Sequence, residues 1–171
     1  MKKAYLEALQ GRRAEIKRQW DTLLRAVPPT TPLAHPDTLV HLMDESLRQL
    51  FSLFHSRSTR SWLIRHPPAA NRIGTDCHCR LNPLINYFIA GQTALDFVAQ
   101  SVPREEHHLK DLDATACVDE LLLIFRFLSH REINAFCEVC QYSPVNARAA
   151  NGGAAAKPVC PLPWRAPVGR C

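Results

Sequence analysis

Residues 77–92 read CHCRLNPLINYFIAGQ. Two thiols and an imidazole lie on a loop that runs directly into a helix. Asn82 is a good N-cap, because its side-chain oxygen can accept a hydrogen bond from an N–H of the first helical turn, and Pro83 suits the first helical position. Apolar residues then recur on one stripe of the helix, at Leu84, Phe88, Gly91, Leu95 and Val98, with Ile85 and Ile89 alongside. The stretch predicts a core-facing helix over residues 82–100.

The composition indicates an ordinary globular chain. It has 171 residues, of which 46% are hydrophobic and 22% charged, enough for one domain and a tail. The net charge of +5 permits anionic partners without requiring nucleic acid. No apolar run reaches the roughly 18–20 residues that span a bilayer, and no signal-peptide core follows Met1. We therefore expect a cytoplasmic protein without a membrane span.

Helical periodicity recurs along most of the chain. Apolar stripes predict helices over about residues 2–26, 36–54, 82–100 and 104–128, and residues 56–76 remain open between a helical turn and a loop. Ser129 and Glu132 fit the capping-box pattern, which predicts a fifth helix from Ser129; one continuous helix to about Tyr142 is the alternative. The expected fold is all-α: a bundle of four or five helices over residues 1–142, followed by a disordered tail rich in Pro, Ala and Gly over residues 143–171.

Two cysteine pairs are the candidate metal ligands. Cys77 and Cys79 form the first pair, Cys137 and Cys140 form the second, and His78 is a substitute ligand. Thiolates and imidazole suit zinc or iron, and the same thiols could serve as a redox sensor. The spacing is not that of a zinc ribbon, so ordinary reduced thiols, two of them facing the core, are the alternative.

The metal hypothesis depends on whether the chain breaks at Ser129. The short connection at residues 101–103 predicts that the helices on either side are antiparallel neighbours. At about 1.5 Å per residue, the level of Asn82 is then expected near residues 121–125. A continuous helix would carry the second cysteine pair roughly 15–20 Å past the first. A break would let a fifth helix fold back toward it.

Two further function classes have weaker signals. The basic stretch of residues 57–80 could contact nucleic-acid phosphates, but a solvated loop is the favoured interpretation, because no nucleic-acid-binding fold accompanies it. Glycine-rich phosphate loops, nucleophile elbows and zinc-protease motifs are absent from the sequence. An enzyme would need a thiol nucleophile, for which Cys77 before a helix N-terminus is the best candidate. We therefore expect a protein that is not an enzyme.

The order of features resembles the N-terminal domain of the co-antagonist proteins of the bacterial stressosome. The likeness covers about residues 14–128 and rests on Trp20, on a helix opened by Pro36 and Leu39, and on the Asn82-Pro83 helix with Phe88. The resemblance implies a globin-like helical domain without haem that senses and dimerises. The family's following phosphorylatable domain has no counterpart here, and the cysteine pairs are not part of its pattern, so no functional residue is carried over.

These observations together predict a non-enzymatic regulatory or sensory module. It is expected to act through protein–protein association, as a homodimer or with a protein partner, because the helices over residues 82–128 carry more apolar residues than one core-facing stripe needs.

Overall fold

The computed structural model describes residues 3–65, 82–103 and 111–139. This part of the chain is all-helical and contains no strand. Its α-helices are α1 (Lys3–Gly11), α2 (Arg13–Arg25), α3 (Pro36–Leu39), α4 (Met43–His55), α5 (Arg57–Arg65), α6 (Pro83–Gln100) and α7 (Asp111–Val139), with 3₁₀ turns η1 (Pro32–Ala34) and η2 (Val40–Leu42). The all-α prediction is confirmed for these residues, while the predicted tail over 143–171 lies outside them.

The predicted number of helices is wrong, because the described residues alone contain seven. The expected helix over 2–26 is interrupted at Arg12, whose φ of −96° and ψ of 17° leave the helical region. The expected helix over 36–54 tightens into a 3₁₀ turn at Val40–Leu42. The stretch left open after residue 56 begins with helix α5.

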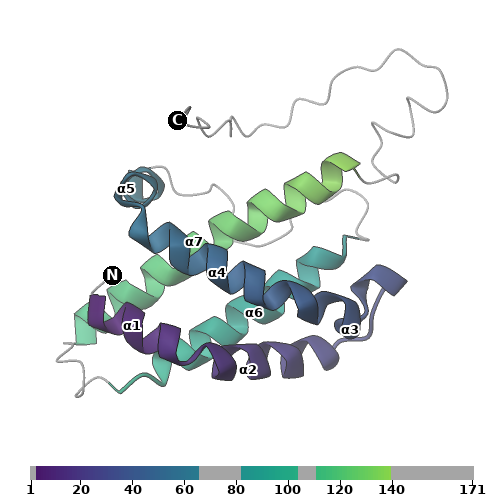
Figure 1. Ribbon diagram of the computed structural model, residues 1–171, viewed down its shortest axis with the longest axis horizontal. Coiled ribbons are helices and arrows are strands. Elements are labelled where there is room, and N and C mark those ends of the chain that lie inside the picture. Colours follow the sequence, from purple (N-terminus) through teal and green to yellow (C-terminus); the bar gives the residue numbers. More distant parts are fainter. Residues whose placement is uncertain (1–2, 66–81, 104–110, 140–171) are drawn as a thin grey trace, which may run out of the picture.

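The predicted start of the third helix is confirmed. Asn82 has an extended backbone, and its side-chain oxygen accepts a hydrogen bond from the Leu84 N–H at 2.9 Å, with Pro83 in the first turn. α6 then runs between α2 and α7 (Figure 1). It is the helix on which both of these neighbours pack.

Four aromatic rings from these three helices meet in the centre of the core. The Trp20 ring centroid lies 4.6 Å from that of Tyr87 and 5.7 Å from that of Phe125, and Phe88 lies 5.7 Å from Phe125. Trp20 Nε1–H donates to the Tyr87 carbonyl at 2.8 Å, so the buried indole N–H is satisfied. α2, α6 and α7 are thereby joined by packing and by a directional bond.

Of the two alternatives at Ser129, a break or a continuous helix, the structure has the continuous helix. α7 continues without interruption from Asp111 to Val139. Ser129 is fully buried, and its hydroxyl donates to the Phe125 carbonyl one turn back at 2.8 Å. Glu132, the other member of the expected capping box, pairs with Arg131 at 2.7 Å. Both side chains are therefore used inside the helix and neither caps a new one.

Candidate functional site

One of the four predicted metal ligands lies in the described part of the chain. Cys137 is half-buried on α7, and its Sγ accepts a hydrogen bond from Asn82 Nδ2 at 3.3 Å. The same amide donates to the Ile133 carbonyl at 3.2 Å. Asn82 therefore caps α6 with its oxygen and ties that end of α6 to α7 with its nitrogen. The other three predicted ligands, Cys77, Cys79 and Cys140, and the substitute His78 lie outside the described residues.

For Cys137, the expected overshoot past the start of α6 is wrong. Asn82 meets α7 at residues 133–137, about three turns beyond the expected level of 121–125. The level of 121–125 would hold for a helix that starts at residue 104, level with the end of α6. A continuous α7 therefore brings Cys137 to the start of α6, and a break is not needed for that approach.

The described residues form no ready metal site by themselves. Among residues 3–65, 82–103 and 111–139, no three His, Cys, Asp or Glu side chains cluster closely enough to hold an ion. The basic stretch of 57–80 is described only as far as Arg65, within α5, and the candidate nucleophile Cys77 is outside. The functional hypotheses on these segments remain predictions.

The side of α6 that faces away from α2 and α7 presents large apolar residues to solvent. Phe97 is 58% and Ile89 46% exposed, and Ile85 is half-buried beside them. With Thr93, Asp96 and Gln100 these residues occupy an arc of about 120° on the helix; we call this set of six the α6 outer face. Asp96 is the one charged residue in the 18 residues of α6.

Phe97 is a functional candidate that the sequence pattern missed. Phe88, Gly91, Leu95 and Val98 of the predicted stripe are buried, but Ile89, which was expected alongside them, is exposed, and Phe97 falls outside the stripe. The sequence does contain one indication of it. Phe97 is an aromatic residue that lies off the core-facing stripe of α6, so the predicted core assigns it no place to be buried.

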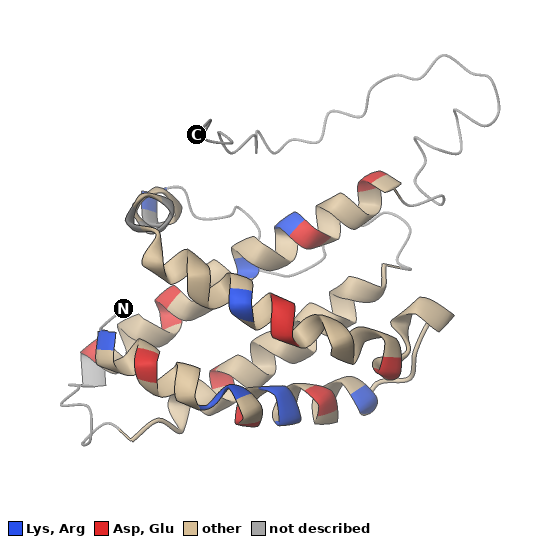
Figure 2. Ribbon diagram, in the orientation of Figure 1, with Lys and Arg blue, Asp and Glu red and all other residues tan. Residues whose placement is uncertain are grey.

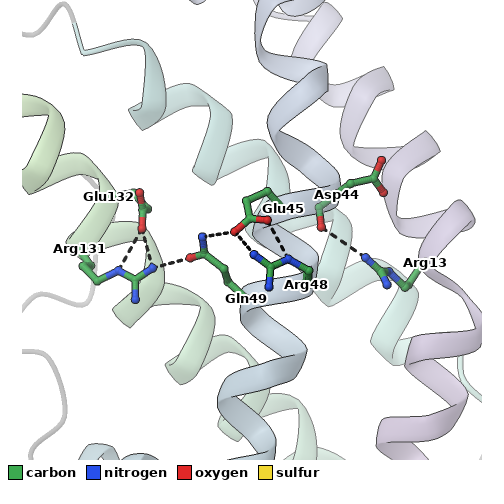
Figure 3. Close-up of polar contacts among 7 residues, drawn as sticks. All are labelled: Arg13, Asp44, Glu45, Arg48, Gln49, Arg131 and Glu132. Atoms are coloured by element: carbon green, nitrogen blue, oxygen red, sulfur yellow. Dashed lines mark hydrogen bonds and ion pairs between the residues drawn. The ribbon is translucent and has the colours of Figure 1, made fainter. Parts of the chain in front are cut away.

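Charged side chains gather instead on α2, α4 and α7, whereas α6 is almost free of them (Figure 2). Figure 3 shows part of this polar surface, in which Arg48 pairs with Glu45 at 2.6 Å, Gln49 donates to Glu45, and Arg131 reaches Gln49 from α7. The guanidinium of Arg48 lowers the pKa of Glu45. These pairs are exposed, so each contributes little to stability.

A second carboxylate on α4 is held by α2. Lys17 Nζ lies 2.6 Å from Asp44 Oδ2, and this hydrogen bond lowers the pKa of Asp44. The backbone carbonyl of Asp44 accepts a separate hydrogen bond from Arg13 (Figure 3). The contacts orient α2 and α4 relative to one another.

No family model, curated protein or solved structure matches the chain. In the described ranges, none of the helices combines the length and apolar character needed to cross a bilayer.

Proposed function

We propose that the protein is a non-enzymatic regulatory or sensory module that acts by helix–helix association, with the α6 outer face as its self-association surface. The observation that carries the proposal is the exposure of Phe97 and Ile89 on a helix with a single charged residue. Depletion of charge and enrichment in aromatic residues distinguish the centres of interfaces from the rest of a protein surface.

The charge distribution favours a second copy of this chain as the partner. The whole chain carries a net charge of +5, so two copies repel one another over most of their surfaces. The α6 outer face has no Lys or Arg, and Asp96 is its single charged residue. A two-fold dimer brings the same patch together from both chains, which a patch with one charged side chain permits at a low electrostatic cost. The same role follows from the resemblance to the stressosome co-antagonist domains.

Substitutions on the α6 outer face test the proposal by sedimentation velocity. Phe97→Gln should weaken self-association by about tenfold or more, since buried aromatic residues dominate interface energies. Ile89→Thr should weaken it by a smaller factor and leave the thermal melting temperature close to that of the wild type.

Val27→Thr is the matched control. Val27 is β-branched and 45% exposed, against 46% for Ile89, and lies just after α2. It should leave the association constant unchanged. Equal effects of Ile89→Thr and Val27→Thr would overturn the assignment of the surface.

A second candidate function is metal binding or thiol redox sensing by the two cysteine pairs. The observation in its favour is the 3.3 Å contact of Cys137 with Asn82, which follows Cys79 by three residues. Three residues of chain span at most about 10 Å, so the first pair is tethered within reach of α7. A zinc ion bound by thiolates at about 2.3 Å requires its ligands to lie close together, and this short connection permits that.

The metal content of the purified chain tests this second candidate. Stoichiometric zinc or iron that is lost in Cys137→Ser and Cys79→Ser variants supports a metal centre. Metal-free protein in which Cys137 and Cys79 form a reversible disulfide supports redox sensing. Metal-free protein with no such disulfide contradicts both.

A further inference from the structure

An open groove lies where the bend between α1 and α2 faces α4. Its volume is about 420 Å³, within the range of small-molecule sites. The lining residues, which define what we call the α4 groove, are Gln10, Arg13, Arg48, Phe51, Ser52 and His55. The set includes two arginines and a histidine but no carboxylate. The groove is separate from the α6 outer face.

Arg13 forms no ion pair with a carboxylate of the described residues, although its charge helps to lower the pKa of the nearby Asp44. Its one hydrogen bond there goes to the backbone carbonyl of Asp44, at 3.3 Å. The nearby Asp44 carboxylate is bound by Lys17 instead. A guanidinium has five N–H donors, so most of those on Arg13 remain for a ligand.

The Arg13 guanidinium is also held in place. Its Cζ lies 5.9 Å from the centroid of the Phe51 ring, within cation–π distance, and Phe51 is itself buried in the core. An arginine fixed over an aromatic ring loses less side-chain freedom when it binds an anion than a free one does. The groove therefore offers a donor fork that is oriented before binding.

His55 and Arg48 complete the groove from α4. His55 Nδ1 lies 2.9 Å from the Phe51 carbonyl. Because a carbonyl can only accept, Nδ1 carries the proton of that bond, and Nε2 of the neutral ring is an acceptor. Arg48 donates Nε and Nη2 to Glu45, so its charge is balanced while Nη1 is not used (Figure 3).

We propose that the α4 groove binds the oxyanion group of a small ligand, a phosphate or a carboxylate, through Arg13, with Arg48 and Ser52 as secondary contacts. The forked donors of arginine match both oxyanions. No carboxylate among the lining residues competes with the anion, and the groove is large enough for an organic group attached to it.

The test is a chemical-shift titration of ¹⁵N-labelled full chain at constant ionic strength with inorganic phosphate, glycerol 3-phosphate and acetate. We expect saturable shifts confined to the amides around residues 10–13 and 48–55. Stronger shifts with glycerol 3-phosphate than with inorganic phosphate would identify a monoester ligand, and stronger shifts with acetate a carboxylate.

Arg13→Gln should weaken binding about tenfold, as expected for loss of a charged hydrogen-bond donor. Arg18→Gln is the control, because it removes the same charge from the same helix. Arg18 is exposed and does not line the groove. Arg18→Gln should change affinity less than about twofold, since screening limits distant charges. Arg13→Lys keeps the positive charge, so it is a second variant in case Arg13→Gln fails to fold. Its affinity for the anion should still be lower than that of the wild type. Absence of saturable shifts, or equal weakening by Arg13→Gln and Arg18→Gln, overturns the proposal.

Discussion

The indole of Trp20 lies so close to Gly91 that no larger residue fits at that position. A Cβ built at residue 91 would lie 2.5 Å from Cε2 of Trp20, closer than real side-chain contacts come. The absence of a side chain lets α2 approach α6 at the point where Trp20 Nε1–H reaches the Tyr87 carbonyl. Gly91 is therefore a packing residue of the aromatic centre.

Gly91→Ala should lower the free energy of unfolding by about 1–3 kcal/mol, the usual cost of overpacking. Gly11→Ala is the matched control, because a Cβ there meets nothing within 4 Å. It should be neutral or stabilise by up to about 1 kcal/mol by restricting the unfolded chain. Urea denaturation of both variants measures the difference, and two equal changes would contradict the packing argument.

A buried hydrogen bond joins α4 to α6. The hydroxyls of Ser46 and Tyr87 lie 3.0 Å apart in the core. Tyr87→Phe should cost about 1–2 kcal/mol of stability, because Ser46 is left without this buried partner. Adding Ser46→Ala should cost less than the sum of the single changes, as expected for two groups in contact. Additive losses in denaturant unfolding would show that the two hydroxyls do not interact.

The same burial makes stability sensitive to alkali. Burial raises the pKa of Tyr87 above its ordinary value of 10.0. The folded state then holds this proton more tightly than the unfolded state, so stability is full below about pH 10 and falls as the pH rises above it. Wild type should lose more stability than Tyr87→Phe between neutral pH and alkaline pH. Parallel losses in the two proteins would contradict the assignment.

The start of α6 could be predicted because Asn82 and Pro83 are residue types that open a helix. Ser129 and Glu132 have the spacing of a capping box, but Ser129 is buried within the continuous helix α7. Tertiary burial decided between a cap and a continuous helix, and a four-residue pattern does not contain that information.

The α6 outer face and the α4 groove could not be predicted from the sequence, for a different reason. Phe97 and Ile89 share the α6 outer face with Thr93, Asp96 and Gln100, and the sequence alone does not show whether a neighbouring helix covers these two apolar side chains. Their exposure follows from the positions of α2 and α7 on the other side of α6. Likewise, Arg13, Arg48 and His55 come from two helices whose relative position no spacing encodes.

Asn82 joins two helices through one amide group, and two substitutions separate its roles. Asn82→Ser keeps a capping oxygen but loses the donors to Ile133 and Cys137. Asn82→Ala loses both functions. We expect stability losses of about 1 kcal/mol for Asn82→Ser and about 2 kcal/mol or more for Asn82→Ala, from the usual values for a cap and for a buried hydrogen bond. Equal losses in thermal unfolding would mean that only one of the two roles contributes.

The most direct test of the central claim is the molar mass of the full chain by sedimentation equilibrium from low to high micromolar concentration. The account predicts a mass that rises toward twice that of the single chain, and that stays at the monomer value when Phe97, 58% exposed on α6, is replaced in Phe97→Gln. A wild-type mass equal to the monomer at every concentration would contradict the claim that the α6 outer face is a self-association surface.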